Sequence, residues 1–203
     1  MTSLLVGVDV GTTHLKVGLF DETGEIRAFA QRDCSPRHLP GGRAELDADE
    51  WWLAFCDAFA DCLAGCGAGT VCSIGISTQA QTYVYVDADG EVLAPALSWL
   101  DSTGDAEGTA RALAAHDYYA HTGWAGPDPM LASCKLRRWA REDARARAAH
   151  LLFPDGYLML RLTGQAAVSR NLAPMSGLYS MVEGDWWAPA IEAAGVRREL
   201  LPP

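Results

Sequence analysis

The chain has little positive charge for its length. Its 203 residues include 16 Lys and Arg against 26 Asp and Glu, which gives a net charge of −10. Proteins that bind nucleic acid rely on Lys and Arg to displace counterions from the phosphates. The composition therefore argues against a nucleic-acid partner.

A basic leader and long apolar runs are also missing. The segment 1–9 contains no Lys or Arg, and its apolar run stops at Asp9. That run is far shorter than the core of a signal peptide or a membrane span. The pattern predicts a cytoplasmic protein without a membrane partner.

The six cysteines show neither CxxC spacing nor a secretory context, so neither zinc nor disulfides are indicated. Cys62 and Cys66 would share one face of a helix, which leaves a metal or redox pair open. Small buried thiols are the interpretation we favour.

The remaining composition is that of a folded globular chain. Hydrophobic residues make up 49% of it and charged residues 21%, outside the range of disordered sequences. This length can form one large or two small domains. One basic cluster is interrupted by Glu142 and Asp143 at helical spacing, which predicts a solvated helix face without a partner. The cluster consists of Lys135, Arg137, Arg138, Arg141, Arg145 and Arg147.

The first third of the chain alternates strand and turn signals. Apolar runs at 4–8 and 17–20, followed by the segment 26–31, predict three strands of an antiparallel meander. The residues Asp21 to Gly24 supply the turn chemistry between the second and third strands. The Pro- and Gly-rich segment 37–43 is expected to be a loop.

A helix is predicted after Asp47, which is an N-cap candidate with Glu50 as its acidic N3 partner. Trp51, Phe55, Phe59 and Leu63 recur every four residues as its apolar face, and Gly65 and Gly67 end it.

Further strands are followed by a region rich in helix signals. We expect a buried strand at 71–77, a hairpin strand from Thr82 with a turn at 87–90, and helices within 106–150, interrupted at 123–129. Another helix is expected at 155–162, ended by Gly164. The predicted fold is α/β, with strands early and helices late.

One turn carries the parts of a phosphate and magnesium site. It reads Asp9-Val-Gly11-Thr12-Thr13-His-Leu-Lys16 between two buried strands. Gly11 lets the backbone approach a ligand, backbone N–H groups and the hydroxyls of Thr12 and Thr13 can donate to phosphate, and Asp9 can hold Mg²⁺. It is not a Walker A loop. On spacing alone, a plain hairpin turn explains these residues equally well.

Further motifs follow the Asp9 turn in a fixed order: Pro40-Gly-Gly-Arg-Ala-Glu45, Asp49-Glu-Trp-Trp52, Gly75-Ile-Ser-Thr-Gln79, Trp99-Leu-Asp101, Leu152-Phe-Pro-Asp-Gly-Tyr157 and Glu199-Leu-Leu-Pro202. This ordered set resembles the FGGY family of carbohydrate kinases, xylulokinases most of all. The resemblance covers nearly the whole chain. It implies an RNase H-like, actin-like ATPase fold, with a mixed sheet that opens with the meander and has helices packed around it.

The resemblance also implies site residues and ligands. ATP and Mg²⁺ would be the cofactors, with Asp9 toward the metal and Gly11, Thr12, Thr13 and Lys16 toward phosphate. A sugar or polyol would be held by Gln79, Ala80, Gln81, Trp99, Asp101 and Met130. From the residues alone, we favour a core aromatic as the interpretation of Trp99 and an N-cap of a helix at Ala106 as that of Asp101.

The sequence departs from the family pattern at the sugar loop. Gln79-Ala80-Gln81-Thr82 stands where xylulokinases have Gln-Met-His-Gly, no Arg follows Asp101, and the Lys-Leu-x-Trp signature is degenerate at 135–139. The sugar and the hydroxyl that it offers are therefore not identified by sequence.

Family kinases continue beyond the region equivalent to Pro203. We expect residues 1–203 to form an incomplete N-terminal domain whose partner, a C-terminal nucleotide-binding domain, is absent, and the general base to lie beyond Pro203. Asp155, at a helix start, and Asp185, in a turn, are rejected as the base. The chain alone is expected to be inactive.

Two other functional classes were weighed. A non-catalytic sugar-binding or regulatory module derived from a kinase would suit the altered sugar loop. An actin-like or chaperone-type ATPase subdomain is disfavoured because those folds use no sugar pocket and would not need the Trp99-x-Asp101 element. A homodimer stays open.

Overall fold

The computed structural model describes residues 2–67, 69–139 and 142–203, which form two compact units. The first unit comprises the described part of 1–36 and 47–79. The second unit comprises the described part of 37–46 and 80–203.

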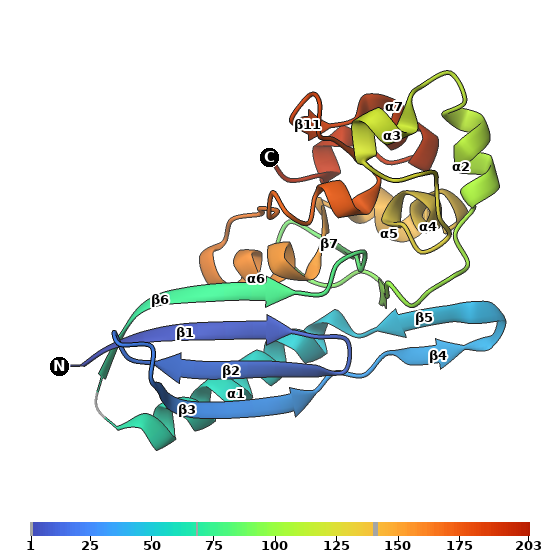
Figure 1. Cartoon of the computed structure of the whole chain (residues 1–203). Coiled ribbons are helices and arrows are strands. Elements are labelled where there is room, and N and C mark those ends of the chain that lie inside the picture. Colours follow the sequence, from blue (N-terminus) through green and yellow to red (C-terminus); the bar gives the residue numbers. More distant parts are fainter. Residues whose placement is uncertain (1, 68, 140–141) are drawn as a thin grey trace. The chain divides into compact units, whose positions relative to one another are not determined.

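The first unit is built on a four-stranded mixed sheet with the strand order β3-β2-β1-β6. β1 is antiparallel to β2, β2 is antiparallel to β3, and β6 runs parallel to β1 (Figure 1). The strands are β1 (Thr2–Val10), β2 (His14–Phe20), β3 (Ile26–Asp33) and β6 (Gly69–Thr78). This arrangement confirms the predicted meander and the mixed sheet.

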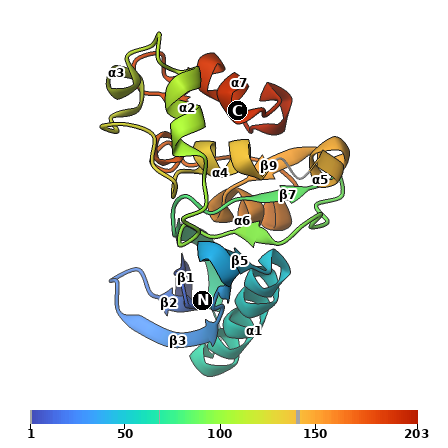
Figure 2. The same cartoon turned by 90° about the vertical axis from the view of Figure 1, so that its right-hand side faces the viewer.

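Helix α1 (Ala48–Cys66) lies along one face of this sheet, against β2 and β3 (Figure 2). The Asp47 carboxylate caps it by accepting from the N–H of Asp49 at 3.0 Å, as predicted. The expected apolar stripe was wrong at its end, because Leu63 is 40% exposed. Residues spaced by four are offset from one another by about 40° around the helix axis. By Leu63 this offset has moved the stripe off the buried face of α1, on which Cys62 lies.

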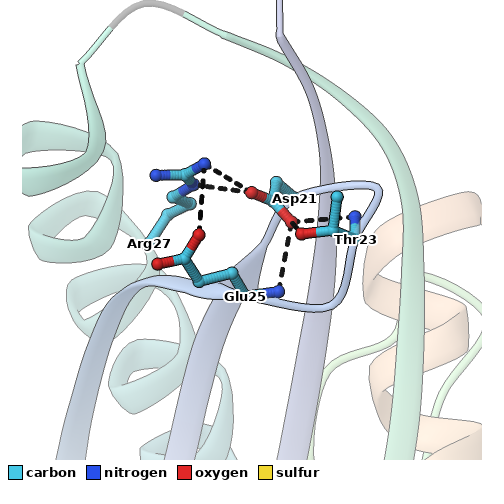
Figure 3. Close-up of polar contacts among 4 residues, drawn as sticks. All are labelled: Asp21, Thr23, Glu25 and Arg27. Atoms are coloured by element: carbon cyan, nitrogen blue, oxygen red, sulfur yellow. Dashed lines mark hydrogen bonds and ion pairs between the residues drawn. The ribbon is translucent and has the colours of Figure 1, made fainter.

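Two turns of the chain share one hydrogen-bond pattern. In the β2–β3 turn, Asp21 accepts from the N–H groups of Thr23 and Glu25 and from the Thr23 hydroxyl (Figure 3). These bonds, with the Thr23 hydroxyl as the largest cause and the Arg27 guanidinium contributing, hold the pKa of Asp21 below its ordinary value, although burial acts in the opposite direction. Asp87 accepts in the same way from the N–H groups of Asp89 and Glu91.

The second unit begins with a hairpin where the sequence predicted a loop. The strands β4 (Arg37–Leu39) and β5 (Arg43–Leu46) pair across the short helix η1 (Pro40–Gly42), and β5 also pairs with β8 (Ala96–Leu97). Gly41 and Gly42 have φ angles of 79° and 85°, which glycine adopts without strain. The Pro-Gly-Gly segment is therefore the turn of a hairpin.

The rest of the second unit is mainly helical, with two small sheets. β7 (Val84–Val86) pairs with β9 (His150–Leu152), and β10 (Tyr179–Ser180) pairs with β11 (Asp185–Trp186). The strand β9 was not predicted. The helices are α2 (Ala106–Ala112), α3 (Tyr118–Thr122), α4 (Ala132–Arg138), α5 (Glu142–Arg147), α6 (Pro154–Thr163), α7 (Ala188–Ala194), η2 (Pro174–Ser176) and η3 (Arg198–Leu200).

Several local predictions can be compared with these helices. Gly164 ends α6 in the left-handed conformation, as expected. Helix α2 is capped by Asp105, which accepts from the N–H of Gly108, so the N-cap role considered for Asp101 was wrong. The predicted solvated basic face was wrong at Lys135, which is fully buried, and Arg141 lies outside the described residues.

All six cysteines are free thiols, three of them buried: Cys34, Cys62 and Cys134. Within the described part of the chain, none of the helices has the length and apolar character that crossing a membrane requires.

Candidate functional site

The turn after β1 places a carboxylate beside an ammonium group. Asp9 and Lys16 are opposite each other in the β1–β2 register, and Lys16 Nζ lies 3.1 Å from Asp9 Oδ2. Their side chains are 47% and 44% exposed. An ion pair this exposed contributes about 0–1 kcal/mol. Its two partners can therefore turn to a bound cation and a bound phosphate at little cost.

The backbone between them is a tight turn that requires glycine. The N–H of Gly11 donates to the carbonyl of His14 at 2.9 Å, and a Cβ added at Gly11 would lie 3.0 Å from that carbonyl oxygen. The Thr13 hydroxyl is 2.8 Å from His14 Nδ1. Thr13 is exposed, while Gly11 and Thr12 are partly exposed. The Gly11 amide is thus engaged within the turn, so a phosphate would have to use other donors.

An open groove of about 500 Å³ runs over the sheet face that bears Asp9 and Lys16. Gly7 and Gly18 lie beneath it, and the ring of Phe20 packs 2.9 Å from where a Cβ of Gly18 would stand. The residues that line the groove do not include Gly11, Thr12 or Thr13. The meander agrees with the prediction, and the side chain of Asp9 is half-exposed beside this groove. That the backbone N–H groups of this turn donate to phosphate stays a prediction.

A magnesium ion fits this turn only together with a nucleotide. No group of three or more His, Cys, Asp or Glu side chains that could hold a metal occurs among the described residues. Mg²⁺ typically takes one or two carboxylates and completes its shell with water and substrate phosphates. The half-exposed carboxylate of Asp9 matches that limited role.

In the second unit, Gln81 has an unusual backbone conformation. Its φ of 58° is the only positive value at a residue other than glycine in the described part of the chain. Its side-chain amide lies against the carbonyl oxygens of Met130 and Met175, and with its nitrogen facing them it donates to both, at 3.3 and 3.2 Å. Ala80 and Gln81 are partly exposed, and Met130 is 40% exposed. The structure thus brings Gln81 and Met130 together.

Trp99 and Asp101 occupy the turn after β8. The N–H of Trp99 donates to the Thr82 hydroxyl at 3.0 Å, which ties this turn to the residue after Gln81. The Asp101 carboxylate is fully buried and accepts from the N–H groups of Ala44 and Thr103 and from the Thr103 hydroxyl. Asp101 therefore stabilises its own loop, and its predicted contact with a sugar stays a prediction.

Gln79 closes the first unit, where its N–H donates to the carbonyl of Val10 at 2.8 Å. The predicted phosphate residues and Gln79 belong to the first unit, and the other predicted sugar residues belong to the second. That the phosphate residues and the sugar residues bind a nucleotide and a sugar that react with each other stays a prediction.

Sequence reasoning missed Lys135 as part of this region. Its Nζ lies 2.7 Å from the carbonyl oxygens of both Gln81 and Ser98. Burial lowers the pKa of Lys135 to about 7, while the charge of Asp101 acts in the opposite direction. A signal existed in the sequence, because Lys135 follows the apolar residue Leu131 at a spacing of four residues, which is typical of one helix face.

The two carboxylates rejected as a base also have structural positions. Asp155 lies in the first turn of α6 and accepts from the N–H of Ser169 at 2.7 Å. Asp185 pairs with Arg198 at 3.2 Å on the surface.

Comparison with known proteins gives a consistent picture. Residues 4–203 match the profile of the FGGY family of carbohydrate kinases, N-terminal domain. The xylulose kinase of Streptomyces rubiginosus is 31% identical over 199 residues, which cover 94% of this chain and 38% of that protein. The glycerol kinase of Xanthobacter autotrophicus is 31% identical over 219 residues, which cover all of this chain and 43% of that protein.

A solved structure agrees with these sequence relatives. The xylulose kinase of Rhodospirillum rubrum superposes with a TM-score of 0.89 at 25% identity, over 98% of this chain and 42% of that one. The fold is that of the RNase H-like, actin-like ATPases, as predicted. The chain spans about two fifths of the length of the relatives that it matches. Because the match extends over residues 4–203, the chain belongs to the FGGY family of carbohydrate kinases and carries their N-terminal domain.

Proposed function

We propose that the chain is the N-terminal part of an ATP-dependent kinase that transfers the γ-phosphoryl group to a hydroxyl of a ketose or polyol. The observation that carries this proposal is the turn after β1, where Asp9 and Lys16 pair at the surface beside Gly11 in a chain of this family. Xylulose is the first candidate, and glycerol and gluconate follow because relatives carry those names.

The first unit would hold the phosphate end of the nucleotide. Asp9 would bind Mg²⁺ directly or through water, and Lys16, released from its pairing with Asp9, would approach a phosphate oxygen. The hydroxyls of Thr12 and Thr13 would donate to phosphate as well. When bound, Mg²⁺ neutralises charge that develops on the transferred group.

The second unit would hold the acceptor. The indole of Trp99 would pack against the C–H face of a sugar, Gln81 and Ala80 would line the same side, and Met130 would contribute to the floor. Gln79 is the one residue assigned to the sugar that belongs to the first unit. We assign no general base within residues 1–203, and expect it in a later part of the kinase.

Sugar binding is the direct test. We expect calorimetric titration with xylulose, ribulose, glycerol and gluconate to show saturable binding of at least one of them, and Trp99→Ala to raise its Kd about tenfold, which corresponds to about 1.4 kcal/mol of lost contact. Trp52→Ala, on α1 of the first unit, is the matched control and should leave the Kd unchanged. Failure of the whole panel to bind would refute the sugar-site assignment.

A further inference from the structure

Two short segments of the second unit bear most of the residues assigned to the sugar. One is the turn around Gln81, which follows β6, and the other is Ser98–Asp101, which follows β8. They begin side by side, because Tyr83 and Leu97 exchange backbone hydrogen bonds at 3.2 and 3.0 Å. Beyond that pair the two segments are no longer joined by a regular ladder. There the Trp99 N–H donates to the Thr82 hydroxyl at 3.0 Å, and further contacts must fix the carbonyls of the two segments.

Lys135 on α4 reaches both segments at once. Its Nζ donates to the carbonyl of Gln81 and to the carbonyl of Ser98, each at 2.7 Å, and its side chain is fully buried. A buried ammonium group is costly unless it is hydrogen-bonded and neutralised. Here the two carbonyls accept from it and the charge of Asp101 offsets part of the burial cost, although burial still lowers the pKa of Lys135 to about 7. The chain therefore places a costly group where it adds a second link between the two turns, beside the hydrogen bond from the Trp99 N–H to the Thr82 hydroxyl.

The Gln81 turn needs such support because it is strained. A residue other than glycine with a positive φ is destabilising by itself and persists only where its surroundings hold it. The hydrogen bond from Lys135 holds the carbonyl of Gln81, and the carbonyls of Met130 and Met175 hold its side chain.

We propose that Lys135 is a positioning residue that holds the Gln81 turn and the Ser98–Asp101 turn together as one rigid edge of the acceptor site. It acts through these backbones and does not itself touch the sugar. The role of this linkage in sugar binding rests on the proposed function. The linkage itself can be measured without any ligand. Replacing the ammonium with an apolar group would leave two buried carbonyls with one donor fewer each, so both turns would loosen.

Lys135→Met tests the linkage, because methionine is unbranched and apolar and has no donor. The reporters are the amides of Trp99 and Asp101, which donate to the Thr82 hydroxyl and to the Ser98 carbonyl. We expect their hydrogen exchange, followed by NMR in the full chain, to accelerate about tenfold, in line with the loss of about 1.4 kcal/mol of local stability. The Kd of any sugar that binds the unaltered chain should rise by a similar factor.

Arg137→Met is the matched control on the same helix. Arg137 binds Asp105 and the carbonyl of Ala193 and does not contact either turn by any of its described hydrogen bonds. This variant should leave the exchange of the Trp99 and Asp101 amides unchanged. Unchanged exchange in Lys135→Met, or faster exchange spread evenly over residues 80–203, would overturn the proposal. Absence of sugar binding by the unaltered chain would instead count against the proposed function.

The unaltered chain decides the matter if Lys135→Met does not fold. Lys16 and Lys135 are its only lysines, so lysine-selective isotope labelling gives two side-chain signals. A linked Lys135 should show ammonium protons that exchange slowly and lie close in space to residues 81 and 98. If neither lysine shows such protected protons, the proposal is wrong.

Discussion

The buried charged residues of the second unit differ in how completely their polar atoms are hydrogen-bonded. Asp101 and Lys135 are surrounded by hydrogen-bond partners, whereas Asp155 accepts at Oδ2 from the N–H of Ser169 while its Oδ1 is buried without a partner. Burial is the main cause that raises the pKa of Asp155 above 3.8, and the N–H groups of Ser169 and Gly156 act in the opposite direction. Asp155 is therefore a residue whose charge the folded state disfavours.

We predict that Asp155→Asn changes the pH dependence of stability. Because the folded pKa is raised, the unfolded chain loses its proton first as the pH rises above 3.8, and the native chain loses stability until the pH passes the folded pKa. Asn keeps an acceptor for Ser169 but cannot ionise. The melting temperature of the variant relative to the original should therefore rise between acid and neutral pH, by roughly 2–4 °C for each kcal/mol relieved. Calorimetry across this pH range measures it, and a difference that does not vary with pH would contradict the prediction.

At the scale of elements, replacing a helical glycine with alanine is expected to have opposite effects on stability in α1 and in α6. Gly65 lies in α1 with nothing within 4 Å of an added Cβ, whereas a Cβ on Gly156 in α6 would stand 2.4 Å from the carbonyl oxygen of Ala167. Helix propensity alone favours alanine at both positions by up to about 1 kcal/mol. Contact with a backbone atom that cannot move freely reverses this preference at Gly156.

We predict that Gly65→Ala stabilises the first unit by about 0.5–1 kcal/mol. Gly156→Ala should destabilise the second unit by about 1–3 kcal/mol, the range typical of overpacking. Urea unfolding followed through amide signals of each unit separates the two effects. Equal gains at the two positions would show that α6 can shift away from residue 167.

These elements also show what sequence could and could not supply. The meander, α1 and the end of α6 were predictable because their signals are local: apolar runs, the Asp47 cap and Gly164. The β4–β5 hairpin and β9 were missed because each depends on a partner distant in sequence, such as β8 for β5 and β7 for β9. The burial of Lys135 was missed for a related reason. A charged side chain is expected to be exposed, and the two carbonyls that accept hydrogen bonds from Lys135 are distant in sequence.

At the scale of the molecule, the candidate site was predicted mainly through family resemblance. Composition and spacing left the Asp9 turn equally consistent with a plain hairpin, and the ordered motifs decided between the two. The structure adds that the buried Asp101 carboxylate accepts from the N–H of Ala44 on β5 and that Gln81 is strained. Neither fact has a local sequence signal, because both arise from packing between segments far apart in the chain.

At this scale we also expect that the 203-residue chain alone does not release ADP from ATP with any sugar. Phosphoryl transfer requires a held nucleotide, a placed Mg²⁺ and an acceptor oriented toward a base, and only Asp9 and its turn are assigned to that set here. Sugar binding should survive, because all of the residues assigned to the sugar lie within the chain. A coupled ADP-release assay across pentuloses, hexuloses and polyols, beside a version extended past Pro203, measures this. Turnover by the 203-residue chain would refute it, and sugar binding without turnover by the extended version would favour a non-catalytic sugar-binding module.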